Sequence, residues 1–134
     1  MRNMLVACGH NEKNEFVEAH FGDSPQYSIF DVQPSEIRLI KTINNTTMTE
    51  EEDFEHGDPK KARAITMLFK ELGVQVLVGR RFGPNIKRIV KTFVPVIVNC
   101  KTVEEGVELV RENLDKIKEE YDKKEGRTHI KLKK

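Results

Sequence analysis

Residues 74–98 read VQVLVGRRFGPNIKRIVKTFVPVIV, and this stretch decides the fold that we predict. It contains two short apolar runs, Val74 to Val78 and Val94 to Val98, with the length and composition typical of strands that are buried on both faces. Between them lie the turn Gly79 to Asn85 and a short amphipathic segment, which Pro84 opens as a helix. Strand, helix and strand in this order predict two parallel strands joined by a right-handed crossover.

Three further strands are expected before this unit. Met4 to Cys8 is a continuous apolar run of strand length. Gln26 to Val32 and Ile37 to Ile43 are rich in residues that favour strands, and residues 33–36 between them, Gln-Pro-Ser-Glu, have the chemistry of a turn. This turn joins the two runs as an antiparallel pair, so we expect the first three strands to form a meander.

Two longer helices complete the predicted pattern. The first begins at residues 58–59, where Asp and Pro supply an N-cap and a first-turn proline, and ends before Gly73. The second begins at the capping-box sequence of residues 102–105 and continues to Tyr121, because apolar residues recur at steps of three and four. Residues 44–58 are polar and acidic, and we expect them to form a long loop.

These elements predict one three-layer α/β domain over residues 1–122, with a mixed five-stranded sheet and three helices. The meander and the two crossovers give the strand order 3-2-1-4-5, with strand 2 antiparallel to its neighbours. Ligands of such sheets bind beyond the carboxyl ends of the strands, beside the point where the order reverses, here between strands 1 and 4. Residues 123–134 are expected to be a basic, flexible tail.

Composition and charge exclude several classes of protein. The 134 residues contain no run of the ~20 apolar residues needed to span a bilayer and no signal-peptide pattern, so we expect a cytoplasmic protein without a membrane partner. Residues 1–122 carry 17 basic and 21 acidic side chains, whereas a nucleic-acid-binding domain is basic. We therefore expect no nucleic-acid partner. We also expect the protein to be a monomer or a weak homo-oligomer.

The turn after the fourth strand is a candidate wall for an anionic ligand. Gly79 and Gly83 permit sharp backbone geometry, and Arg80 and Arg81 are cationic donors for a phosphate or carboxylate. Asn85 lies where the next helix directs its free amide groups toward the same edge. The alternative is that the two glycines only turn the chain. The glycine spacings of nucleotide-binding loops are absent, so a nucleotide enzyme is not expected.

His20, Phe21 and Gly22 interrupt an otherwise polar loop. Phe21 is expected to pin the loop to the core and Gly22 to let the backbone bend, so that the His20 imidazole points outward and can bind a metal. The strand order brings four further candidate ligands toward the same edge, although their spacing matches no zinc signature: Cys8, His10, His56 and Cys100. We expect an open, exchangeable site. The alternatives are that His20 is an ordinary surface residue and that both cysteines are structural.

Four segments of the chain together resemble a known family. They are the first strand, the His20-Phe21-Gly22 motif with Tyr27 to Val32, the turn from Val78 to Asn85, and the helix start at residues 102–105. Over residues 4–115 the chain is similar to the dinitrogenase iron-molybdenum cofactor biosynthesis family. The resemblance implies a ribonuclease-H-like fold and a small carrier that transiently binds an iron-sulfur or iron-molybdenum-type metallocluster or its precursor. It also implies that His20 contacts the cluster and that donor or acceptor proteins of the cluster are partners.

Two other functions compete with this interpretation. Nucleases of the ribonuclease-H-like fold hold two metal ions with clustered carboxylates. Here the first strand has no carboxylate, and Asp31 at the end of the second strand has no obvious second carboxylate beside it. Because no nucleophile with a neighbouring base stands out either, we do not expect an enzyme. The other possibility is a regulatory or interaction module that binds an organic anion or a protein partner without metal, and composition does not exclude it.

Overall fold

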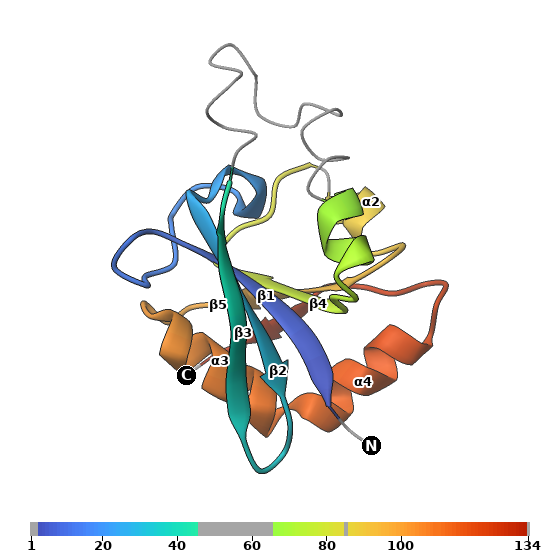
Figure 1. Ribbon diagram of the computed structural model, residues 1–134. Helices are drawn as coiled ribbons and strands as arrows, with labels where there is room; N and C mark the ends of the chain where they lie inside the picture. Colours follow the sequence, from blue (N-terminus) through green and yellow to red (C-terminus); the bar gives the residue numbers. More distant parts are fainter. Residues whose placement is uncertain (1–2, 46–65, 85, 134) are drawn as a thin grey trace.

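The structure is a computed structural model in which residues 3–45, 66–84 and 86–133 are described (Figure 1). Its middle layer is a six-stranded sheet in the order β3-β2-β1-β4-β5-β6. The strands are β1 (Met4–His10), β2 (Gln26–Val32), β3 (Ile37–Asn44), β4 (Val76–Gly79), β5 (Val94–Val98) and β6 (Ile130–Leu132). β2 runs antiparallel to β1 and β3, whereas β1, β4, β5 and β6 are parallel to one another. The predicted order of the first five strands and the antiparallel second strand are confirmed.

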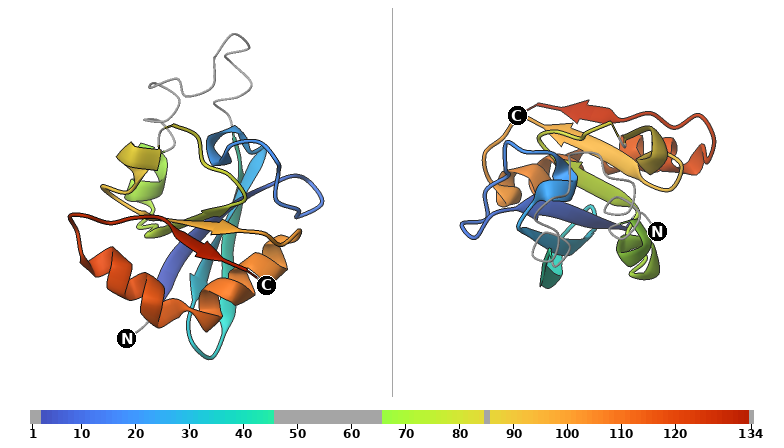
Figure 2. Two further views of the ribbon diagram at one scale, coloured as in Figure 1. Left: turned by 180° about the vertical axis from the view of Figure 1, so that it is seen from behind. Right: turned by 90° about the horizontal axis from the view of Figure 1, so that it is seen from above.

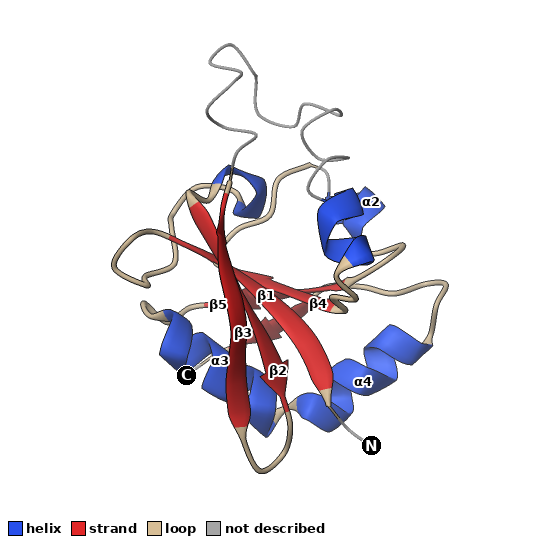
Figure 3. Ribbon diagram, in the orientation of Figure 1, coloured by secondary structure: helices blue, strands red, loops and turns tan. Residues whose placement is uncertain are grey.

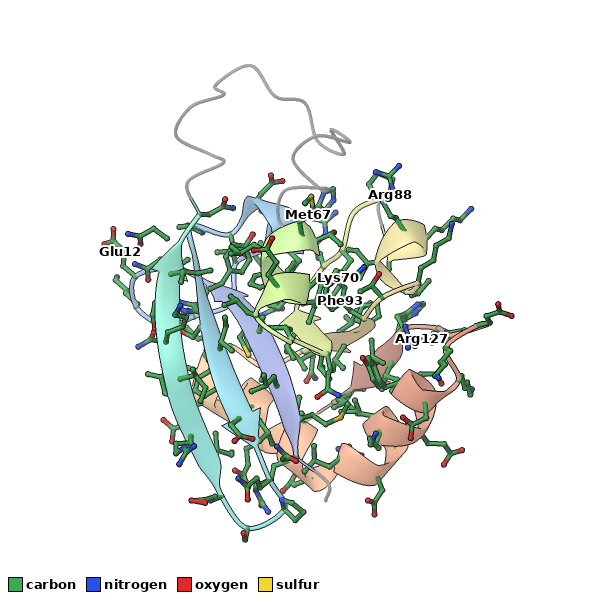
Figure 4. All side chains as sticks on the ribbon, turned by 45° about the vertical axis from the view of Figure 1, so that its right-hand side comes forward. Glu12, Met67, Lys70, Arg88, Phe93 and Arg127 are labelled. Carbon is green, nitrogen blue, oxygen red and sulfur yellow. The ribbon has the colours of Figure 1, made fainter. Side chains whose placement is uncertain are left out.

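Helices cover both faces of the sheet and make the three predicted layers (Figure 3). On one face, α3 (Val103–Glu112) and α4 (Leu114–Asp122) pack over a core that includes alternate residues of β1, β4 and β5. On the other face, helical residues 66–71 and α2 (Ile86–Ile89) cover a second, more aromatic cluster. Figure 4 shows Met67 on the outside of the first of these helices, where it is 55% exposed, and the buried Phe93 beneath it. Within the described ranges, no helix is both long enough and apolar enough to cross a membrane.

The long helix expected after residue 102 is interrupted, so this part of the prediction is wrong. It begins as predicted, because the Thr102 hydroxyl accepts from the Glu105 amide and the Glu105 side chain accepts from the Thr102 amide. At Asn113 the backbone leaves the helical region, with φ −122° and ψ 23°, and the Asn113 side chain donates to the Leu109 carbonyl at 2.8 Å. An asparagine side chain that bonds the backbone in this way competes with the helix, and α4 starts afresh after it.

The predicted flexible tail contains β6, so that prediction is wrong for residues 130–132. Ile130 and Leu132 are buried in the core beneath α3 and α4, and β6 pairs with the edge of β5. Arg127 stabilises the connection between α4 and β6, since its side chain donates to the Tyr121 and Lys91 carbonyls at 2.8 and 3.0 Å. Two alternating apolar residues are too short a pattern to predict a strand, and the open edge of β5 supplies the missing backbone partners.

Candidate functional site

Two loops that are distant in the sequence meet at the carboxyl edge of the parallel strands. The 3₁₀ helix η1 (Phe21–Asp23) lies beside the loop that follows β4, and both views in Figure 2 show the two segments together. The Phe21 amide donates to the Arg81 carbonyl at 2.8 Å. The predicted meeting of the His20 loop with residues 79–83 is therefore present in the structure.

The Phe21 ring anchors this meeting point in the core. Phe21 is only 3% exposed, and its ring lies against those of Phe82 and Tyr27, with centroids 5.2 and 5.1 Å away. A Cβ atom added at either Gly9 or Gly79 would lie 3.3 Å from the ring, so the two glycines make room for it on neighbouring strands. Phe21 thus attaches the loop to the core, as the sequence predicts, and supports a cofactor site there only by positioning the loop.

Polar side chains form hydrogen bonds to the backbone carbonyls of η1 and of the residue that follows it. The Phe21 carbonyl accepts from the Tyr27 hydroxyl at 2.9 Å and from the Ser24 hydroxyl at 2.8 Å. Asn45 donates to the Gly22 and Ser24 carbonyls at 3.0 and 2.9 Å. Burial raises the pKa of Tyr27, so its hydroxyl remains a donor. The sequence carried no signal for these roles, because Ser24 and Asn45 lie in ordinary polar stretches.

His20 lies at the rim of the edge, directly before the buried Phe21. It is partly exposed, and its ring packs against Gly83: a Cβ atom at residue 83 would lie 2.7 Å from Nδ1 of His20. The absence of a side chain at Gly83 therefore determines where the imidazole sits. Gly22 has no such role, because a Cβ atom there would have no neighbour within 4 Å.

Arg80 and Arg81 add positive charge to the same edge. The Arg80 side chain is 33% exposed, and its Nε lies 3.2 Å from the Glu18 carboxylate. Arg81 is exposed and donates a long hydrogen bond of 3.4 Å to the Glu18 carbonyl. These contacts orient both guanidinium groups next to the His20 loop, where an anion would meet them.

His10 lies at the carboxyl end of β1, but its ring is buried, against our expectation of a metal ligand. The fully buried ring lies with Nδ1 2.7 Å from the Asn11 carbonyl and Nε2 2.6 Å from the Ser28 hydroxyl. Because a carbonyl only accepts, Nδ1 donates to it, and Nε2 shares a hydrogen bond with the Ser28 hydroxyl. Both ring nitrogens are therefore engaged inside the protein, and His10 has a structural role.

Cys8 likewise lies in the core instead of at the site. It is buried among the residues under α3, and this burial raises the pKa of its thiol, whereas a metal binds the thiolate. Cys100 is buried in the same cluster. Successive strand residues point to opposite faces, so Cys8 and His10 face away from Ala7 and Gly9, on whose side Phe21 packs.

Among the described residues that were predicted as metal ligands, His20 is the one that the structure places at the rim of this edge. His56 and Asn85 lie outside the described residues. Among the residues that are described, no three His, Cys, Asp or Glu side chains lie close enough together to hold a metal ion. Asp31 lies near the end of β2, which runs antiparallel, and so belongs to the opposite edge of the sheet. The arrangement offers a single imidazole beside cationic groups.

Comparison with known proteins agrees with this architecture. The sequence profile of the dinitrogenase iron-molybdenum cofactor family matches residues 2–113. The chain belongs to this family. A solved crystal structure of a protein from Methanocaldococcus jannaschii, proposed to be a dinitrogenase, is 18% identical and superposes with a TM-score of 0.60. The alignment covers 85% of this chain and 93% of that one, and at this identity the likeness shows the fold. No curated protein matches the sequence.

The match to the dinitrogenase iron-molybdenum cofactor family ends at Asn113, where the helical layer breaks. The His20 loop and the turn after β4 therefore lie within the family region, whereas α4 and β6 lie outside it. Family membership associates the chain with the iron-molybdenum cofactor in general terms.

Proposed function

We propose that the protein is a non-catalytic carrier that transiently binds an iron-sulfur or iron-molybdenum-type metallocluster or its precursor as cargo. One observation carries the proposal: in a member of this family, the imidazole of His20 lies at the rim of the carboxyl edge, in a place set by Gly83 and by the buried Phe21. A preorganised imidazole of this kind suits the binding of iron through a neutral nitrogen.

The surroundings of His20 suit a cargo that arrives and leaves. Sulfide-bridged clusters commonly carry net negative charge, and Arg80 and Arg81 supply positive charge beside the imidazole. A cluster held by one imidazole and by electrostatic attraction is released more easily than one held by a full set of protein ligands. In this proposal a donor protein delivers the cluster, an acceptor protein removes it, and the carrier is a monomer or a weak homo-oligomer.

The test is anaerobic loading of the purified protein with iron and sulfide or with a cluster donor. We expect absorbance and bound iron in the parent protein, and a loss of at least about tenfold in retained iron in His20→Ala, because losing even a residue that only orients a metal ligand costs about that much. His129→Ala is the matched control, because His129 is exposed and belongs to the C-terminal segment outside the family match. If retained iron does not depend on His20, the protein is better described as a module that binds an organic anion or a partner without metal.

A further inference from the structure

A basic groove lies beside the His20 loop, at the carboxyl ends of β4, β5 and β6. It encloses about 320 Å³. Two cationic pairs line it, Arg80 and Arg81 from the turn after β4 and Lys131 and Lys133 from β6 and the residue that follows it. Glu18 is the acidic residue in its wall, and Ile97 contributes apolar surface. β6, and with it the lysine side of the groove, lies outside the residues that the family profile matches.

The strand register explains why the two cationic pairs face each other across this groove. Gly79 pairs with Ile97, and Ile97 pairs with Lys131, so these three residues form a row across the parallel strands. Phe21 covers the row at Gly79. Ile130 and Leu132 point into the core on the α3 side, so Lys131 between them points to the opposite face and remains exposed. Phe21 therefore leaves Ile97 and Lys131 uncovered, and Lys131 stands at the end of the row that is farthest from Phe21.

The balance of charge in the groove is positive. Glu18 forms an ion pair with Arg80, while Arg81, Lys131 and Lys133 are exposed and line the groove as well. Like charges held at one site repel, and an anion that reaches several of them relieves that repulsion. An anion with several charged groups can neutralise more of this positive charge than an anion with one, because its groups can contact the arginine side and the lysine side together.

We infer that this groove binds a small oxyanion that carries several carboxylate or phosphate groups. The volume lies at the lower end of the range of small-molecule sites, roughly 300–1,000 Å³, which fits a compact ligand. Arginine and lysine both bind such groups through charge-assisted hydrogen bonds. The groove shares Arg80 and Arg81 with the proposed cluster site, but the inference does not depend on the proposed function, since it involves neither His20 nor a metal.

Isothermal titration of metal-free protein at low, constant ionic strength tests this inference. Inorganic pyrophosphate and citrate serve as the phosphate and carboxylate probes, and the one that binds more tightly identifies the class of ligand. We expect saturable binding at one site, and about tenfold or greater weakening in the double variant Lys131→Met with Lys133→Met, since two charge-assisted contacts are lost. Methionine keeps the aliphatic stem, and the melting temperature reports whether β6 remains docked.

A matched control separates the groove from general electrostatics. Lys41→Met with Lys116→Met removes the same charge from exposed positions on β3 and α4, and should leave the affinity unchanged within about twofold. Arg81→Met tests the other side of the groove if the lysine variant loses β6. Absence of saturable binding of both probes, or equal weakening by the two double variants, would overturn the inference. Because no metal is present, either result leaves the His20 test unaffected.

Discussion

Replacing Gly83 by alanine is expected to displace the His20 imidazole while the fold is retained. The added Cβ atom would lie 2.7 Å from Nδ1 and 3.1 Å from Cε1 of His20. Ordinary contacts of this kind begin at 3.4 Å, so the ring must retreat by roughly 0.7 Å or turn to another rotamer. The clash involves the tip of a partly exposed side chain, which can move without disturbing the core.

The expected effect on stability is small and the effect on metal binding is large. Gly83 is not among the described glycines with positive φ, which are Gly73 and Gly126, so an alanine suits its backbone. A compatible Gly-to-Ala change stabilises by about 0.4–1 kcal/mol, and a displaced rotamer costs about 0.5–1.5 kcal/mol, so the free energy of unfolding should change by less than about 1 kcal/mol. A binding site tolerates displacements of about 0.5 Å in its contacting groups, so moving the His20 ring farther than this should lower retained iron by about tenfold.

Three measurements check this prediction: the NMR signals of the His20 ring, the melting temperature, and retained iron after anaerobic loading. Gly22→Ala is the matched control, because it adds the same methyl group in the same loop without any neighbour within 4 Å. We expect the ring signals and retained iron to change in Gly83→Ala and to stay at parent values in Gly22→Ala. Unchanged ring signals in Gly83→Ala, or equal losses in both variants, would refute the reasoning.

Three further predictions concern the core and the C-terminal strand. Phe21→Ala should lower the free energy of unfolding by about 3–5 kcal/mol in denaturant titrations, because it empties a buried aromatic position, and a loss below about 1 kcal/mol would contradict the packing. Burial raises the pKa of the Cys8 thiol above its ordinary value of 9.0, so the unfolded chain releases a proton first and stability falls as the pH rises above 9. This loss approaches about 1.4 kcal/mol per pH unit for one group, and Cys8→Ala should show a shallower slope, whereas an identical slope would contradict the assignment. Arg127→Gln should raise amide exchange in β6 by about tenfold while β1 is unaffected, because the guanidinium contacts to the Tyr121 and Lys91 carbonyls are lost, and unchanged exchange would show that β6 docks without them.

The candidate site shows where strand order alone was sufficient for prediction. The apolar runs and their connecting segments predicted that the His20 loop and the turn after β4 share one edge, and the hydrogen bond between Phe21 and Arg81 shows that they do. The same argument brought Cys8 and His10 to that edge, but it considered only the end of the strand and not its faces. The alternation of side chains along β1 could have separated both residues from the side on which Phe21 packs.

The sequence by itself determined the order of the first five strands and the chemistry available at the carboxyl edge, because apolar runs and helical apolar patterns are local and each spans several residues. Only the tertiary structure decided the break at Asn113, the docking of β6 and the place of the His20 ring. Each of these depends on a partner distant in the sequence or on the exact path of the backbone: the open edge of β5 for Ile130 and Leu132, and Gly83 for His20. Such contacts leave no period in the sequence, and the basic groove that β6 completes became visible only when the chain was folded.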